Sequence, residues 1–135
     1  MSTRNITSAK EDKFKYFWDK KAKKYPSPFA EKSLVETERM LRTVKQQGVV
    51  FTGKEILDIG CGTGIYTLPI AREAASVTGF DFSETMLDRL DAEIKQHHIK
   101  NVKTLQAEWR FFDISSNGFE KAFDIVWTAM SIAVM

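Results

Sequence analysis

Three glycines at alternate positions follow an apolar run that contains an acid. The run is Ile56–Ile59, the acid is Asp58, and Gly60, Gly62 and Gly64 come next. A buried strand that ends in a glycine turn can hold a small molecule against its backbone, because glycine has no Cβ to keep the ligand away. Backbone N–H groups at the start of a following helix can bind its polar groups. This spacing predicts a nucleotide-type cofactor site in a βαβ unit.

The position of the third glycine excludes two common nucleotide sites. Dinucleotide sites follow the pattern G-x-G-x-x-G, whereas the third glycine here comes one position earlier and is followed by Ile65. No Gly-Lys-Ser/Thr follows, which excludes a Walker loop. A second element accompanies the glycines: residues 77–81 are expected to form a strand that ends in an acid, Asp81, 17 residues after Gly64.

The pattern Asp-Ile-Gly-Cys-Gly-Thr-Gly at 58–64, together with Asp81 and the segment 82–87, resembles motif I and the second strand of the class I S-adenosylmethionine-dependent methyltransferases. The resemblance implies that Asp81 accepts hydrogen bonds from both ribose hydroxyls, a task that suits the two oxygens of a carboxylate. It implies that Phe82 covers one face of the adenine, although a place in the core is the alternative. Asp58 matches the acid of motif I and would act beside a cofactor that carries an ammonium and a sulfonium, either through water or by holding the turn.

Three further segments extend this resemblance over about residues 14–131. Residues 102–109 resemble the third-strand motif, in which Glu108 would accept the adenine amino group and Trp109 would pack on adenine or serve as core. Residues 123–127 resemble the fourth-strand motif, with Trp127 near the methionine end of the cofactor and Asp124 in a structural role. Residues 17–25 resemble the opening of small-molecule methyltransferases, where Tyr25 would reach the cofactor carboxylate or pack in a lid. The remaining expected cofactor contacts are Cys61, Met86 and Ala107.

The order of elements predicts an α/β fold, a Rossmann-like three-layer sandwich with a mostly parallel sheet. Strands are expected at 54–59, 76–80, 102–106 and 123–128, and helices at 10–24, 30–47, 64–74 and 83–97. Pro69 should bend or shorten the third helix. Aromatic residues are expected on one face of the first helix, and Leu34, Leu41 and Val44 on the inner face of the second. The aromatic residues are Phe14, Phe17, Trp18 and Tyr25. Residues 1–50 would form a helical lid and 51–135 the cofactor-binding core, within one structural domain.

Composition limits the class of protein. The chain has 135 residues, 43% hydrophobic residues and a net charge of +2, as expected for one globular domain. It has no apolar run long enough for a membrane span and no apolar signal core. Cys61, the single cysteine, fits a reducing cytoplasm. It is expected to fill the glycine turn, not to act as a nucleophile. No metal site is expected.

Residues 1–30 contain eight Lys or Arg and three acidic residues. A basic arm of this kind can bind nucleic acid, but lysines interleaved with aromatics at helical spacing favour a solvated helix face.

The resemblance implies methyl transfer from S-adenosylmethionine to a small-molecule acceptor, with S-adenosylhomocysteine as the product. No general base is identified. The alternatives are a non-catalytic cofactor-binding module, a nucleic-acid methyltransferase and, least favoured, a nicotinamide oxidoreductase. Four strands are predicted where the family has seven, so the chain is expected to be a truncated form. Alternatively, a second copy pairs with the fourth strand, since an open edge strand invites association.

Overall fold

The computed structural model describes residues 9–129. Its helices are α1 (Ala9–Ala22), α2 (Glu31–Gln46), α3 (Thr67–Ala71) and α4 (Glu84–Gln96), with a 3₁₀ turn η1 (Trp109–Phe111). Its strands are β1 (Glu55–Ile59), β2 (Ser76–Asp81), β3 (Val102–Gln106) and β4 (Ile125–Thr128).

The four strands form one parallel sheet in the order β3-β2-β1-β4. The central strands carry apolar residues that are buried on both faces, as parallel sheets require. Ile56 of β1 and Val77 of β2 are fully buried and are paired in register. This arrangement confirms the predicted α/β, Rossmann-like fold.

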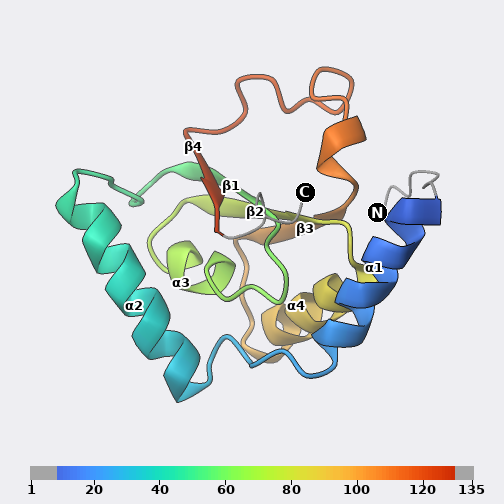
Figure 1. The fold of residues 1–135 in the computed structure, drawn as a ribbon. Coiled ribbons are helices and arrows are strands. Elements are labelled where there is room, and N and C mark those ends of the chain that lie inside the picture. The colour runs from blue at the N-terminus through green and yellow to red at the C-terminus, as the bar shows by residue number, and fades with distance from the viewer. Residues whose placement is uncertain (1–8, 130–135) are drawn as a thin grey trace.

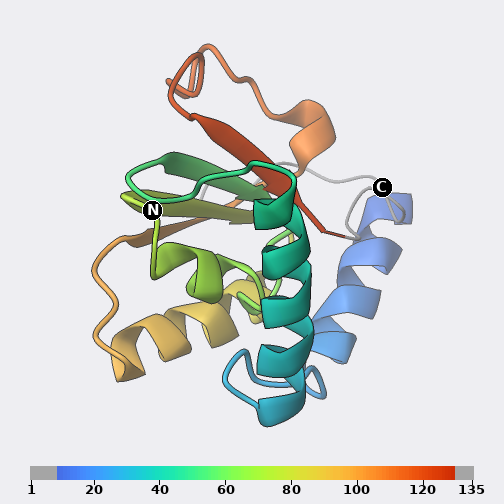
Figure 2. The ribbon, with the colours of Figure 1, turned by 90° about the vertical axis from the view of Figure 1, so that its left-hand side faces the viewer.

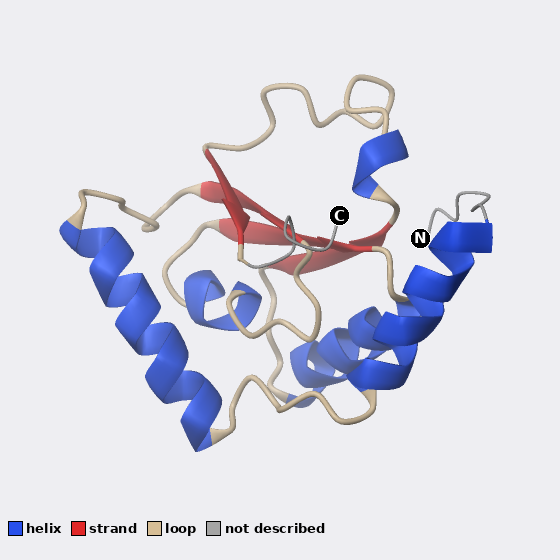
Figure 3. Cartoon of the chain, viewed as in Figure 1, coloured by secondary structure: helices blue, strands red, loops and turns tan. Residues whose placement is uncertain are grey.

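Different layers cover the two faces of the sheet (Figure 1). Helices α3 and α4 lie on one face, where Ile56, Ile70 and Val77 belong to the largest apolar cluster. The segment between β3 and β4, which includes η1, lies over the other face in both views (Figures 1 and 2). A series of aromatic rings holds that segment to the sheet: Phe80 contacts Trp109 and Phe112, and Phe119 contacts both Phe112 and Phe123. The third layer is therefore mostly loop (Figure 3).

Helices α1 and α2 flank the α3–α4 layer on opposite sides (Figure 1). Helix α1 packs against α4, and Leu41 of α2 packs into the cluster with Phe51 and Ile70. The buried residues of α2 are Ser33, Thr37 and Leu41, so the expected inner face is right for Leu41 but begins with two polar residues.

Two expected elements differ in extent. Helix α3 has five residues instead of the expected eleven, because it begins at Thr67 and places Pro69 in its first turn, where the missing N–H of proline is tolerated. Strand β4 begins at Ile125 instead of 123. Asp124 lies just before it, where its N–H donates to the Glu55 carbonyl (2.8 Å) and its Oδ2 accepts from the Glu55 N–H (2.9 Å). These bonds agree with the structural role expected for Asp124.

The predicted aromatic face of α1 is wrong for Phe17, whose side chain is 53% exposed. Its ring packs edge-on against Trp18 (centroids 5.4 Å apart). Helix α1 has its main contacts with α4, which leaves part of its surface exposed. The side chain of Phe14 lies outside the described residues. Within residues 9–129, no helix combines the length and apolar character needed to cross a membrane.

Candidate cofactor site

A cavity of about 460 Å³ opens at the carboxyl ends of the strands, the usual place for a ligand in an open α/β sheet. Its size falls in the range of small-molecule sites. Four groups of residues line it: Trp18, Tyr25 and Pro26 after or within α1; Ser33, Glu36 and Thr37 of α2; Asp58–Gly62, Ile65 and Tyr66 around the glycine turn; and Phe80–Phe82, Met86, Ala107–Trp109 and Ala129.

The glycine turn is fixed by backbone bonds to the neighbouring strand. The N–H groups of Gly60 and Cys61 both donate to the Phe80 carbonyl (2.6 and 3.1 Å). Gly62 has a φ of +57°, a conformation that favours glycine, and its N–H donates to Asp81 Oδ2 (2.9 Å). The N–H groups of this turn are therefore already paired within the protein. The turn contributes to the site because its backbone forms part of the cavity wall.

Asp81 ends β2 and is held by the backbone on both of its oxygens. Besides the Gly62 bond, Oδ1 accepts from the N–H of Ser83 (2.9 Å). A third hydrogen bond comes from the backbone of Phe82, so the two carboxylate oxygens are held in place at the cavity wall. The pKa of Asp81 is raised to about 6, first by burial and also by the nearby charge of Asp19. The geometry fits a vicinal diol.

Asp58 is the second buried acid at the cavity, only 3% exposed. The hydroxyl of Thr67 donates to its Oδ2 (2.6 Å). Burial raises its pKa to about 7, and the charge of Asp81 adds to this effect. A positively charged ligand group beside this carboxyl would favour its ionised form.

The residues expected to surround the adenine line the same cavity. Phe82, Met86, Ala107, Glu108 and Trp109 all line the cavity. The N–H of Ala107 donates to the Asp81 carbonyl (3.0 Å), which joins the loop after β3 to the end of β2. Glu108 is only 8% exposed, and Trp109 stands edge-on to Phe80. An acidic side chain and apolar surfaces therefore share this end of the cavity.

The opposite end contains residues that sequence reasoning missed, apart from Tyr25. Ser33 and Thr37 are buried on the inner face of α2, and Glu36 lies between them in sequence. The pKa of Tyr66 is raised by burial and by the nearby Glu36 and Tyr25, so these groups lie close together. The signal in the sequence is the spacing of Ser33, Thr37 and Leu41, which places two hydroxyls in line with a core leucine on one helix face.

Two of the expected contact residues lie outside the cavity. A Cβ on Gly64 (φ +91°) would lie 2.4 Å from Cδ1 of Leu90, so this glycine permits close packing onto α4. Trp127 packs on Tyr66 and Phe51 (centroids 5.3 and 6.0 Å), because its β4 position pairs with Asp58 and turns the ring toward the α2–α3 core.

Cys61 is buried beside Leu68, Leu87 and Leu90, and burial raises the pKa of its thiol well above the ordinary value. It is therefore a neutral thiol, and its backbone contributes to the cavity wall. Among the described residues, no group of three or more His, Cys, Asp or Glu side chains could hold a metal ion.

Fold and site together define a Rossmann-like cofactor-binding domain with an acid at the end of its second strand. The methyltransferase domain family matches residues 56–135, more than half of the chain, and the chain belongs to this family. Its fold is that of the class I S-adenosylmethionine-dependent methyltransferases.

Curated relatives act on different kinds of acceptor. The demethylmenaquinone methyltransferase of Lactococcus lactis is 37% identical over 89 residues, which are 63% of this chain and 33% of that protein. A 23S rRNA (uracil(1939)-C(5))-methyltransferase of Psychromonas ingrahamii is 30% identical over 91 residues, 67% of this chain and 20% of that protein. The chain thus spans about a third or less of the length of these two relatives.

Among solved structures, a Haemonchus contortus phosphoethanolamine N-methyltransferase in complex with phosphoethanolamine and S-adenosylhomocysteine has a TM-score of 0.72 at 23% identity. The likeness covers 96% of this chain and 28% of that one. It therefore includes the N-terminal helices as well as the sheet, and it shows the fold.

Proposed function

We propose that this chain binds S-adenosylmethionine and forms the cofactor-binding part of an enzyme that methylates a small molecule. One observation carries the proposal: the Asp81 carboxylate is fixed at the cavity wall by backbone hydrogen bonds that include those from Gly62 and Ser83. Such a group can hold the two hydroxyls of a ribose.

The lining residues support one placement of the cofactor. Asp81 holds the ribose, while Phe82, Met86, Ala107, Glu108 and Trp109 surround the adenine. The backbone of Gly60, Cys61 and Gly62 lies along the methionine part, with Asp58 and Tyr25 facing its charged end. Gly64 and Trp127 have packing roles in this arrangement, as their surroundings in the structure indicate.

When bound, S-adenosylmethionine supplies an activated methyl group on a sulfonium. This chain contributes mainly by orientation, which can account for a large part of a barrier in such transfers. Phe82 and Trp109 exclude water at one end of the cavity, and Trp18 and Tyr25 do so at the other. We assign no general base, since one is needed only if the acceptor must lose a proton.

A small acceptor is favoured over nucleic acid by the charges at the cavity. The described lining residues include Glu36, Asp58, Asp81 and Glu108 but no Lys, Arg or His, and such a wall repels phosphodiesters. The lysines near the C-terminal end of α1 are exposed, and Lys21 lies over the rings of Phe17 and Trp18. RNA methyltransferases among the relatives keep nucleic acid as the second candidate, and salt-dependent binding to RNA would reveal it.

Three further assignments belong to this proposal. Residues 1–50 cover the cofactor core 51–135 as a lid, which the position of Trp18 and Thr37 at the cavity supports. The protein acts in the cytoplasm, in keeping with the free, buried thiol of Cys61. Copies of the chain associate through the edge strand at 123–128, since β4 pairs only with β1 among the described strands.

Calorimetric titration tests the proposal. We expect S-adenosylmethionine and S-adenosylhomocysteine to bind at one site and NAD to give no signal. Asp81→Ala should weaken binding by about 1–3 kcal/mol, the range for a hydrogen bond to a charged group. Asp88→Asn, an exposed acid of α4 outside the cavity lining, is the matched control and should bind as the unaltered chain does. Equal affinity of Asp81→Ala and the unaltered chain would remove Asp81 from the site.

A methyl-transfer assay with labelled cofactor separates an enzyme from a non-catalytic binding module. A non-catalytic module would bind the cofactor but would transfer its methyl group to no acceptor, whether a phenol, an amine or RNA. Transfer of labelled methyl to a phenol or an amine, but not to RNA, is the outcome expected here.

A further inference from the structure

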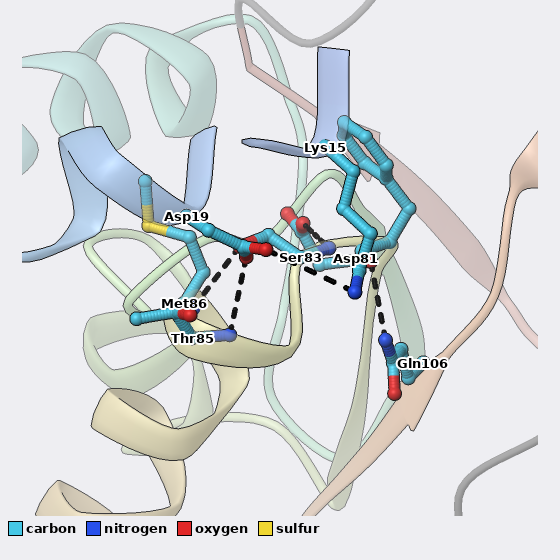
Figure 4. Close-up of polar contacts among 8 residues, drawn as sticks. Lys15, Asp19, Asp81, Ser83, Thr85, Met86 and Gln106 are labelled. Atoms are coloured by element: carbon cyan, nitrogen blue, oxygen red, sulfur yellow. Dashed lines mark hydrogen bonds and ion pairs between the residues drawn. The ribbon is translucent and has the colours of Figure 1, made fainter. Parts of the chain in front are cut away.

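Helix α1 carries an acid that bonds to the turn after β2. Asp19 Oδ1 accepts from the hydroxyl of Ser83 (2.5 Å) and from the N–H of Thr85 (3.4 Å), across 64 and 66 positions of sequence (Figure 4). Lys15, one turn earlier in α1, lies 3.8 Å from Oδ2 of the same carboxylate. The N-terminal helix is thus tied by hydrogen bonds to the first turn of α4.

Ser83 connects this contact to Asp81. Its side chain is fully buried, its N–H donates to Asp81 Oδ1, and its hydroxyl oxygen accepts from the N–H of Met86 (3.2 Å). A serine hydroxyl has a single proton, and in this structure that proton goes to Asp19. Asp19 therefore fixes the rotation of the hydroxyl that caps α4, on the residue whose backbone holds Asp81.

The same helix brings side chains to the cavity. Trp18 precedes Asp19 in α1, and Tyr25 follows the helix; both line the cavity. A second connection to α4 holds this segment, because the Arg89 guanidinium donates to the carbonyls of Ala22 and Tyr25. Residues 18–25 are therefore anchored to α4 by Asp19 at one end and by Arg89 at the other.

The charge of the Asp19 carboxylate indicates that its contact with the start of α4 does more than pack the two helices together. Its carboxylate raises the pKa of Asp81, which opposes the ionised form that would accept hydrogen bonds from a diol. An uncharged acceptor at this position could accept the same two hydrogen bonds without raising the pKa of Asp81. Asp58 of β1 is a further acid close to Asp81, and the charge of Asp81 raises its pKa.

We propose that Asp19 is a positioning residue that couples the helical cover to cofactor binding, by fixing Ser83 and, through it, the carboxylate of Asp81. The inference rests on the proposed function, in which Asp81 holds the ribose. Coupling is reciprocal, so a bound cofactor that immobilises Asp81 also holds α1 more firmly on α4.

Two variants of Asp19 separate geometry from charge. Asp19→Ala removes the acceptor and should weaken S-adenosylhomocysteine binding about fivefold or more, the lower end of typical coupling between sites. Asp19→Asn keeps an oxygen that can accept from Ser83 and Thr85 and should restore affinity at pH 8 to within about twofold of the unaltered chain. Because the Asn variant lacks the charge, the pH at which binding is half lost should move lower.

Hydrogen exchange gives a second readout in the full chain. In the unaltered chain, S-adenosylhomocysteine should slow amide exchange in α1 as well as around the cavity. In Asp19→Ala, the ligand should slow exchange around the cavity but not in α1. Asp88→Asn is again the control.

The outcomes distinguish the two proposals. If Asp81→Ala weakens binding but Asp19→Ala does not, the positioning role is wrong and the proposed function stands. If Asp81→Ala binds normally, the proposed function itself fails. Should Asp19→Ala not fold, Asp19→Asn decides: an unchanged pH midpoint together with ligand-independent exchange in α1 would overturn the coupling.

Discussion

The hydroxyl of Thr67 donates to the Asp58 carboxyl over 2.6 Å, in a place where both residues are almost fully buried. Thr67 is the first residue of α3 and Asp58 lies in β1, so this bond joins the glycine turn at its two ends. The bond lowers the pKa of Asp58, yet burial outweighs it and the pKa stands at about 7.

The raised pKa of Asp58 predicts that the ligand-free chain loses stability as pH rises. The folded form holds this proton up to about pH 7, whereas the ordinary pKa of an aspartate side chain is 3.8. Between these pH values the folded state binds more protons than the unfolded state, so the free energy of unfolding falls as pH increases. Asp81, with a pKa of about 6, acts in the same direction.

Asp58→Asn tests this expectation by denaturant unfolding at two pH values. The amide keeps an oxygen for Thr67 and carries no charge, so the variant should be more stable than the unaltered chain at pH 8, by about 1–3 kcal/mol. At pH 4 the two chains should be nearly equal. The exposed acid variant Asp88→Asn should follow the unaltered chain at both pH values, and a variant less stable at pH 8 would contradict the buried charge.

Cofactor binding should release protons near pH 6.5. S-adenosylmethionine carries a sulfonium and an ammonium, and a positive charge beside Asp58 favours its ionised form. Calorimetry in buffers of different ionisation enthalpy should therefore show release of up to about one proton per cofactor. Adenosine, which has neither charge, is the matched ligand and should release less. Proton uptake with the charged ligand would place its cations away from Asp58.

Gly64→Ala should destabilise the chain without changing the cofactor site. Its Cβ would lie 2.4 Å from Leu90 Cδ1, at a φ of +91°, and strain plus overpacking amount to about 2–4 kcal/mol. Gly53→Ala is the control, since Gly53 has a φ of +72° and open space around it. It reports the backbone cost alone, about 1 kcal/mol. At temperatures where both variants are folded, S-adenosylhomocysteine should bind them as it binds the unaltered chain. If only Gly64→Ala loses affinity, Gly64 contacts the cofactor as the sequence predicted.

Hydrophobic periodicity and glycine spacing predicted those parts of the fold that local sequence and strand order determine by themselves. Strand β3 has its expected bounds, and α4 begins after Ser83, whose hydroxyl caps it. Asp81 and the turn at Gly60–Gly62 meet at the cavity because parallel strands end at the same edge of a sheet. These features depend on local sequence and on the order of strands.

The residues that were missed depend on what lies opposite them. Ser33 and Thr37 are inward-facing polar residues of α2, since a helix face that borders a cavity does not need apolar side chains. Phe17 is exposed because α1 packs mainly against α4 and leaves part of its surface uncovered. Trp127 points to the core because its register with Asp58 decides the face on which it lies. The exposure of Phe17 and the orientation of Trp127 cannot be read from neighbours in sequence.

The exposed edge of the sheet predicts self-association of the chain. Strand β4 pairs with β1 along one side, and in the described part of the chain no strand pairs along its other side. Val126, in the middle of β4, is 59% exposed. Unpaired backbone groups on an apolar edge strand pair with other chains, and a lysine on such a strand prevents this. We therefore expect concentration-dependent dimers or larger species in sedimentation velocity, and a monomer for Val126→Lys.

Val50→Lys is a closely matched control, because Val50 is also 59% exposed but precedes the sheet. It adds the same charge to the same residue type and should leave the association unchanged. If both variants dissociate the chain equally, the effect is one of net charge. If the unaltered chain sediments as a monomer at concentrations of tens of micromolar, β4 does not recruit a second copy.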